Sequence, residues 1–473
     1  MVKWQKVIFC VLFMALTGCS MVPSYERPAL PTAEIYPETT TTATMPQTTP
    51  SIGQLGWREF FTDVRLQELI DLALDNNRDQ RIALERVNEA RGLYGIRRAD
   101  QFPNIDAGIT GGRSRVPSDL SPTGRTETSG HYEAALNLSV WELDFWGRVR
   151  SLTAAALESY LATEEAQRAV TISLIGQVAN TYLIEVELDE LIAIAAHTLA
   201  TREHAYHIML RRYEVGSASK LDAVQAETLL NQARSDLTVL QRRRDLNRNA
   251  LTLLVGTSHG NFETQPLSRI EPGFTREISV GLPSDLLLER PDILAAEHRL
   301  KAANANIGAA RAAFFPSIVL TGSVGTASAE LDGLFGAGSS VWRFTPSLTL
   351  PIFQGGRNVA NLDVAEARRN LAVADYERTI QRAFREVADG LAERRWFTEQ
   401  VFDQQASLAA QTERARLAEL RYQNGAATYL EVLDAERDRF TAEQALVQVR
   451  RALLSSSVNL YAALGGGTAH KPQ

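Results

Sequence analysis

The feature that most constrains the fold is an internal duplication, in which two halves of the chain repeat the same motifs at a nearly constant offset. The segment 212–222 (RYEVGSASKLD) recurs 209 residues later as 421–431 (RYQNGAATYLE). Earlier in each half, 98–103 (RADQFP) recurs as 311–316 (RAAFFP), with an offset of 213. A repeat of this length predicts two copies of one supersecondary unit that pack together.

The distribution of proline predicts long helices within each repeat. No proline lies between residues 122 and 266 or between residues 351 and 472, and proline breaks a helix interior. The segment 147–211 predicts one helix of about 100 Å at roughly 1.5 Å per residue. Further helices are expected at 221–254 and at 66–98. No compact core needs a helix of that length, so a helical rod or tunnel is favoured.

Between the helices, apolar and polar residues alternate with the period of β-strands. The alternation is weak at 105–109 and clear at 132–142, 318–325 and 342–350, with a polar loop expected at 113–131. We expect four strands of about 9–11 residues, the length that a tilted membrane strand needs. A soluble, half-buried sheet would show the same alternation, but it would not need four strands of this length.

One face of this sheet is expected to contact lipid and the other water. Trp141 falls on the polar side if the alternation continues without interruption. We expect lipid contact for Leu136, Leu138, Phe344 and Leu348, and water contact for Asn137, Ser139, Thr345 and Ser347.

Two strands per repeat are too few to close a barrel, because single-chain membrane barrels begin at about eight strands. Open strand edges are not tolerated in lipid. Three copies of the chain would supply twelve strands and pair every edge. We therefore infer that the chain forms a homotrimer.

The N-terminus has the pattern of an export signal. Lys3 and Lys6 precede the apolar run 7–16, and Leu-Thr-Gly-Cys ends at Cys19. The tetrad resembles a bacterial lipobox, which implies cleavage before Cys19 and a covalent lipid on it: N-palmitoyl and S-diacylglycerol. The chain's other cysteine, Cys10, lies in the signal, so thiol catalysis and cysteine metal sites are excluded from the mature chain.

Charge and composition indicate which partners are disfavoured and how the chain is divided. The formal net charge is −7, so no basic field favours nucleic acid. Residues 20–56, rich in proline and threonine, are expected to form an extended tether that buries no core. The expected organisation is a signal peptide (1–18), a lipidated tether (19–60), a first structural repeat (61–265), a linker (266–281), a second structural repeat (282–467) and a C-terminal tail (468–473).

Several longer strings resemble the outer-membrane factor (TolC-like) family of tripartite efflux systems, especially its OprM-like multidrug-efflux lipoproteins. They are 56–61 (GWREFF), 281–287 (GLPSDLL), 290–293 (RPDI), 308–316 (GAARAAFFP) and 464–467 (LGGG). The resemblance implies a mainly α fold with a trimeric twelve-stranded membrane β-barrel and a twelve-helix α-barrel that crosses the periplasm. It also implies a lipid-anchored outer-membrane duct that expels drugs and other small toxic compounds. Its partners would be a periplasmic adaptor protein and an inner-membrane, proton-driven resistance-nodulation-division transporter.

Two turns and one helix carry the expected functional residues. The repeated turns between long helices would form the periplasmic tips that dock the adaptor: Val215, Gly216 and Ser217, then Asn424, Gly425 and Ala426. Leu430 and Asp434 share one helix face, and the resemblance places them at a closed periplasmic gate. The alternative is that Asp434 only pairs with Arg437.

No motif indicates catalysis or a resident cofactor. His204 and His207 are three residues apart, but no third ligand completes a zinc pattern. Arg242, Arg243 and Arg244 would point to different sides of a helix, as on a solvated surface. We therefore expect no enzyme activity and no metal site. A duct for protein or metal-ion export remains an alternative, as does a lipid-anchored periplasmic scaffold without a pore.

Overall fold

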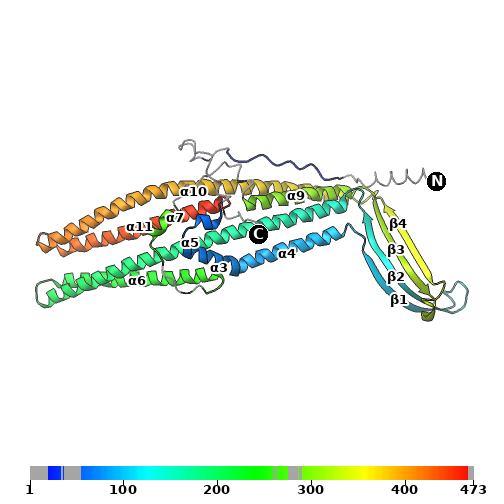
Figure 1. Cartoon of the computed structure of the whole chain (residues 1–473), viewed down its shortest axis with the longest axis horizontal. Coiled ribbons are helices and arrows are strands. Elements are labelled where there is room, and N and C mark those ends of the chain that lie inside the picture. The colour runs from blue at the N-terminus through cyan, green and yellow to red at the C-terminus, as the bar shows by residue number, and fades with distance from the viewer. Residues whose placement is uncertain are drawn as a thin grey trace. The chain divides into compact units, whose positions relative to one another are not determined.

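The computed structural model describes residues 20–33, 36, 55–258, 260, 264–274, 286 and 290–466 (Figure 1). Cys19, the expected signal peptide and the expected C-terminal tail lie outside this part of the chain. The chain divides into two compact units. The strand unit comprises Met1–Ala29, Arg86–Glu164 and Ala295–Tyr376, and the hairpin unit comprises Leu30–Glu85, Glu165–Leu294 and Glu377–Gln473.

The long helices reproduce the duplication residue for residue. Helices α5 (Arg148–Glu214) and α10 (Arg357–Gln423) each have 67 residues, and every boundary is displaced by 209 positions. Each is followed by a turn and a second helix, α6 (Lys220–Val255) or α11 (Tyr429–Ala463). At 1.5 Å per residue, α5 and α10 are each about 100 Å long. The expected tandem repeat and its long helices are confirmed.

The helical segment expected at 66–98 is two helices. Helix α3 (Val64–Asn76) ends at Asn77, and α4 (Arg78–Ala99) begins directly after it. Oδ1 of the buried Asn77 accepts a 3.0 Å hydrogen bond from the Gln80 amide, and Nδ2 donates to the Leu254 carbonyl at 2.8 Å. Asn77 therefore caps α4 and joins it to the end of α6. The apolar spacing did not reveal this break, because it continues through both helices.

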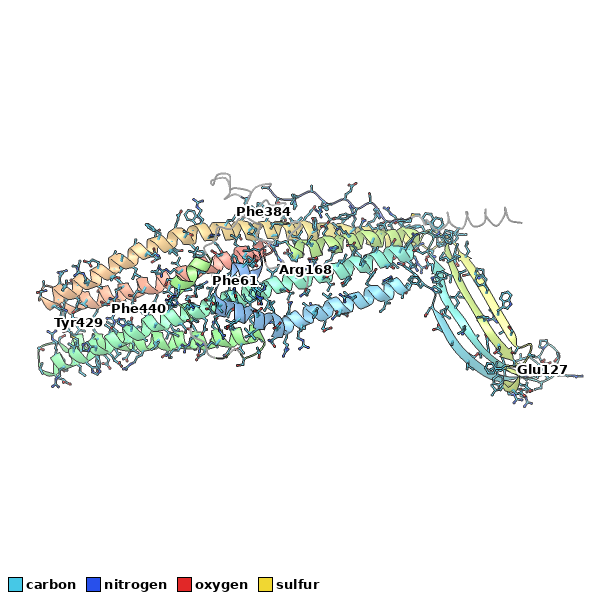
Figure 2. All side chains as sticks on the ribbon, in the orientation of Figure 1. Phe61, Glu127, Arg168, Phe384, Tyr429 and Phe440 are labelled. Carbon is cyan, nitrogen blue, oxygen red and sulfur yellow. The ribbon has the colours of Figure 1, made fainter. Side chains whose placement is uncertain are left out.

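An aromatic cluster forms part of the hairpin unit's core. The rings of Phe60 and Tyr461 stack at 4.1 Å, and Phe61 packs edge-on against Tyr461 at 5.7 Å. All three are at most 3% exposed, and Phe61 lies among the helices of this unit in Figure 2. Phe60 ends α2 (Trp57–Phe60), so the tether expected to reach residue 60 ends in packed structure instead.

Helix α7 (Leu267–Phe274) lies within the segment expected to be a linker. Leu267 and Ile270 are buried, and α7 packs against α11. The linker expectation is therefore wrong for this part of 266–281. An eight-residue helix that contains a proline and a glycine was too short to be distinguished from a loop by periodicity.

Helix α5 is, within the described residues, the one helix long and apolar enough to cross a membrane by length and composition. More than half of its most apolar stretch, 56%, is buried inside the protein. Val178, Leu183 and Val186 of α5 are completely buried. Its apolar character is that of a core helix.

Four strands form one antiparallel sheet in the strand unit, in the order β1-β2-β3-β4 (Figure 1). They are β1 (Ile105–Val116), β2 (Glu127–Leu143), β3 (Ser317–Ser328) and β4 (Ser340–Thr349). Their lengths are 12, 17, 12 and 10 residues. The loop expected at 113–131 is shorter, because residues 113–116 extend the first strand and residues 127–131 extend the second. Helix α9 (Pro291–Ala312) precedes β3, as α4 precedes β1.

A buried arginine joins three segments of the hairpin unit. The side chain of Arg290 is 9% exposed and forms 2.7 Å ion pairs with Asp292 and Glu386. It also donates to the carbonyl of Ala463 at 3.0 Å. Burial alone would lower the pKa of Arg290, but the two carboxylates raise it above its usual value. The residue remains charged and holds the start of α9 to α10 and to the end of α11.

We expect Arg290→Ala to destabilise the protein by about 2 kcal/mol, because the Ala463 carbonyl loses its buried donor and two partly exposed carboxylates lose their common partner. Arg385→Ala is the matched control, since the pair of Arg385 with Asp389 is exposed (73% and 64%) and contributes at most about 1 kcal/mol. Thermal unfolding of the purified protein, followed by circular dichroism at 222 nm, measures both. Equal effects of the two substitutions would contradict a structural role for the Arg290 network.

Candidate channel surface and gate

One face of the four-stranded sheet is apolar and exposed. The strand register places Ala107 opposite Leu136, Leu136 opposite Val324, and Val324 opposite Trp342, so these residues share a face. Leu136 is 52% exposed, Val324 57% and Trp342 75%. A soluble, half-buried sheet would bury such a row, whereas a lipid-facing sheet exposes it to hydrocarbon.

A β-bulge in β2 corrects the expected alternation. Leu138 pairs with Gly322, but the next aligned pair is Trp141 with Leu320, so one extra residue is accommodated on β2. The bulge moves Trp141 to the apolar face, although uninterrupted alternation had placed it with the polar residues. An inserted residue of this kind reverses the facing of every later residue in its strand. Glu142 thereby aligns with Val319 and Leu143 with Ile318.

The opposite face carries polar residues, as expected. Asn137 aligns with Asp106 and with Ser323, and Ser323 with Arg343. The hydroxyl of Ser139 donates to Asp106 at 2.8 Å. Strands β1 and β4 are the two edges of this sheet, and no further strand in the described residues pairs with either. A two-sided sheet with both edges open requires other chains to complete it.

The two faces predict opposite responses to the same substitution. Leu136→Arg should impair assembly in the outer membrane, because an arginine at a lipid-facing midplane position costs about 2–4 kcal/mol. Asn137→Arg, one residue along the same strand, places the charge on the polar face and should have a small effect. The yield of folded oligomer extracted from outer membranes measures both. Equal yields would contradict the assignment of the apolar face to lipid.

Matching glycines reverse the chain at the two tips of the hairpin unit. Gly216 and Gly425 have φ of +75° and +72°, a left-handed conformation that favours glycine. The Ser217 amide donates to the Arg212 carbonyl at 2.8 Å, and Ala426 donates to Arg421 in the same way at 2.8 Å. These bonds satisfy the last carbonyls of α5 and α10, so the repeated sequences form repeated turns.

The tips differ in how the second helix begins. In the first, Ser219 and Asp222 form a reciprocal capping box at the start of α6. In the second, Thr428 makes no side-chain cap, and Arg421 instead binds Glu431 at 3.1 Å. Arg212 of the first tip donates to the hydroxyl of Tyr422 in the second, which joins the two turns. The repeated Arg-Tyr pair was visible in the sequence, but this cross-contact between repeats was not.

Leu430 and Asp434 lie on the exposed side of α11. Val432 and Ala435 face the other way and pack on Ala415 and Ala418 of α10. Leu430 is 50% exposed and the Asp434 side chain 43%. The two candidate gate residues therefore present a leucine and a carboxylate side by side on a surface that this chain does not cover.

Asp434 also has the partner that the alternative interpretation requires. Its Oδ1 lies 3.2 Å from Nη1 of Arg437, whose side chain is 59% exposed. An exposed pair of this spacing contributes about 0.5 kcal/mol at most. Arg414 forms a 2.6 Å ion pair with Asp438 and lowers the pKa of that carboxyl. This region of α11 is thus a mixed-charge surface.

The sequence did not single out two other groups of this region, the buried Arg202 and the partly buried Tyr429. Arg202 of α5 is 6% exposed. Burial lowers its pKa, while Tyr429 and Glu436 of α11 act in the opposite direction. Burial also raises the pKa of Tyr429 to about 12, so the phenol stays neutral. Figure 2 labels Tyr429 near the tip of the second hairpin, and Tyr429 directly precedes Leu430 in the chain.

The remaining sequence candidates lie on helix surfaces. His204 and His207 are exposed, and the described residues hold no group of three or more side chains suited to a metal. Arg244 pairs with Asp189 at 3.5 Å. The triple-arginine segment is thus partly neutralised by an acid of the neighbouring helix.

The N-terminal segment 20–33 is extended but packed, which corrects the expectation of a free tether. Glu297 of α9 is buried and accepts hydrogen bonds from the Tyr25 hydroxyl at 3.0 Å and from Nε and Nη2 of Arg27 at 2.9–3.2 Å. Burial alone would raise the pKa of Glu297, but Arg27, Lys301 and Tyr25 lower it below its usual value. A Cβ on Gly308 would lie 2.5 Å from Val22, so the segment passes directly over this glycine.

Comparison with known proteins identifies this architecture. A family model described as outer membrane efflux protein matches residues 69–257 and 282–466, one segment within each of the two expected repeats. The chain is 45% identical to the probable efflux pump outer membrane protein TtgC of Pseudomonas putida, covering 96% of this chain and 93% of that one. It is also 45% identical to the outer membrane protein OprJ of Pseudomonas aeruginosa, covering 96% and 95%.

A solved structure shows the same fold. The open-state MtrE outer membrane channel of Neisseria gonorrhoeae superposes with a TM-score of 0.86 at 39% identity. The match covers 95% of this chain and 98% of that one. The similarity includes the sheet and both helical hairpins.

Proposed function

This chain belongs to the outer membrane efflux protein family, whose members are efflux channels rather than enzymes, and we propose that three copies of it form a continuous exit duct. The chain is an outer-membrane efflux protein. In the proposed trimer, the sheets form a twelve-stranded barrel in the membrane and the helices form a tunnel that extends into the periplasm.

The observation that carries the trimer is the sheet with one exposed apolar face and two open edges. The open edges are not stable in lipid within one chain, because each unpaired backbone group costs several kcal/mol there, whereas the apolar face is suited to contact with hydrocarbon. Closure of β4 on β1 of another copy satisfies both edges. Four strands from each of three chains exceed the minimum of about eight that a membrane barrel needs.

The proposed cargo is small toxic compounds, including drugs and solvents. One relative with 45% identity is named as an antibiotic efflux pump protein and another with 44% as a solvent efflux pump protein. A duct in the outer membrane needs an energy source, which we assign to an inner-membrane, proton-driven transporter joined through a periplasmic adaptor. A scaffold without a pore would have no use for an exposed apolar sheet.

The test is conduction by the purified full-length protein in planar bilayers. A duct gives discrete single-channel currents, and a scaffold gives none. A complementation assay identifies the cargo. Expressed with its adaptor and transporter in an efflux-deficient host, the chain should raise the minimal inhibitory concentration of the drugs that it exports. Conduction without drug resistance would favour export of proteins or metal ions instead.

We assign the gate to Leu430 and Asp434. Around a threefold axis, three leucines can narrow and dewet the passage, and three carboxylates attract cations. The equivalent positions of the first repeat, 209 residues earlier, are Leu221 and Gln225. The acidic ring therefore comes from the second repeat only.

Replacing Leu430 and Asp434 together by alanine should raise single-channel conductance and lower cation preference. Arg437→Gln separates the two interpretations, because it removes the ion-pair partner of Asp434 and keeps the carboxylate. A gate predicts that Arg437→Gln retains or increases cation preference. If Arg437→Gln and Asp434→Asn instead produced the same loss, the carboxylate would serve only its ion pair.

The two tips are the proposed docking site for the adaptor. Val215, Gly216 and Ser217, with Asn424, Gly425 and Ala426, form the ends of both hairpins. Val215 is 68% exposed, so the first tip presents an apolar side chain to a partner. The contact between Arg212 and Tyr422 holds the two tips as one surface.

Lipidation of Cys19 remains a proposal from the Leu-Thr-Gly-Cys sequence. Cys19→Ala should abolish the acyl groups and prevent lipoprotein-type cleavage. Mass spectrometry of the mature N-terminus detects both changes, with Cys10→Ala as the control because Cys10 lies in the removed signal. An unmodified Cys19 in the wild-type protein would overturn the proposal.

A further inference from the structure

We propose that the face of α9 opposite the N-terminal segment carries a binding site for small amphipathic anions. The site is a groove of about 520 Å³ in the strand unit, lined by parts of α5, α9 and α10. Two arginines, two asparagines and Ser159 supply its polar groups, and alanine, leucine and valine side chains supply the rest. The residues used in the argument are Arg299, Arg368, Asn306, Asn361, Leu152 and Val364.

The charge of the groove is uncompensated. Arg299 of α9 and Arg368 of α10 are exposed, and neither forms a salt bridge with any carboxylate in the described part of the chain. By contrast, Arg311 of the same helix lies 3.9 Å from Glu366. A guanidinium presents five N–H donors in a planar fork that fits carboxylate, sulfonate or phosphate oxygens. Two free guanidinium groups in one groove therefore select an anion.

The uncharged part of the lining favours a ligand that has an apolar portion beside its acidic group. Leu152 and Val364 stand on α5 and α10, and several alanines of α9 form an apolar surface between them. The amides of Asn306 and Asn361 add donors and acceptors without charge. An organic ring or chain with one acidic group satisfies both parts of this lining. An inorganic cation satisfies neither.

The position of the groove follows from the two faces of α9. Glu297, Asn304 and Gly308 contact the N-terminal segment. At 100° per residue, Arg299 and Asn306 point to the opposite side of the helix. In the duct proposed above, the N-terminal segment leads from a membrane anchor and so runs outside, which places the groove in the lumen. This placement rests on the proposed function, whereas the existence of the site does not.

The first experiment measures binding directly. Purified full-length protein in detergent is titrated calorimetrically with naphthalene-1-sulfonate and with its neutral analogue naphthalene-1-sulfonamide, after subtraction of titrations into empty micelles. We expect the sulfonate to bind at least tenfold more tightly. Arg299→Gln combined with Arg368→Gln should weaken sulfonate binding by about tenfold or more and leave sulfonamide binding unchanged.

Arg311→Gln is the matched control, since Arg311 also lies on α9 but outside the groove. It should retain the wild-type affinity. Equal binding of sulfonate and sulfonamide, or an undiminished affinity in the double variant, would overturn the site. Equal losses in the double variant and in Arg311→Gln would also overturn it, because they would reflect net charge rather than the groove.

The second experiment tests the lumenal placement. In planar bilayers, naphthalene-1-sulfonate should transiently reduce the single-channel current of the wild type and of Arg311→Gln, but not of the double variant. Binding without any reduction of current would overturn the lumenal placement. If the protein conducts no current at all, the proposed duct fails, and the titration still decides the site.

Discussion

A β-strand in hydrocarbon must pair all of its backbone N–H and C=O groups, and the rest of this structure depends on that requirement. The sheet of this chain has four strands and two open edges, while its apolar face is exposed. One chain is therefore an incomplete membrane protein. The open edges favour association with other copies of the chain. Because of the duplication, each chain contributes four strands rather than two to the proposed barrel.

The two repeats have the same architecture but differ in the residues that follow their turns. The helices α5 and α10 have identical lengths, and their turns share one backbone conformation. The residues that follow the turns differ: a capping box fixes the start of α6, whereas α11 begins without one. Asp434 likewise has an uncharged counterpart in the first repeat. Divergence thus places the charge of the proposed gate on one hairpin of each chain.

Helix α9 shows how one helix serves two surfaces. Its covered face holds the N-terminal segment through Glu297, whose buried carboxylate has three partners: Tyr25, Arg27 and Lys301. Its other face carries Arg299, which forms no salt bridge within the described residues, toward a groove that Arg368 of α10 also lines. Buried charge is compensated within the chain, as it must be. Exposed charge is left free for solvent or for a ligand, and this contrast distinguishes the structural face from the candidate binding face.

The sequence by itself determined the duplication, the long helices, the amphipathic strands and the tip turns, because periodicity, proline-free length and glycine placement act locally. Only the tertiary structure decided which residues from distant segments meet. The bulge that turns Trp141, the break at Asn77 and the hydrogen bonds of Tyr25 and Arg27 to the buried Glu297 of α9 all depend on contacts between elements. A local pattern carries no record of such contacts, since the free energy that favours them comes from a partner elsewhere in the chain.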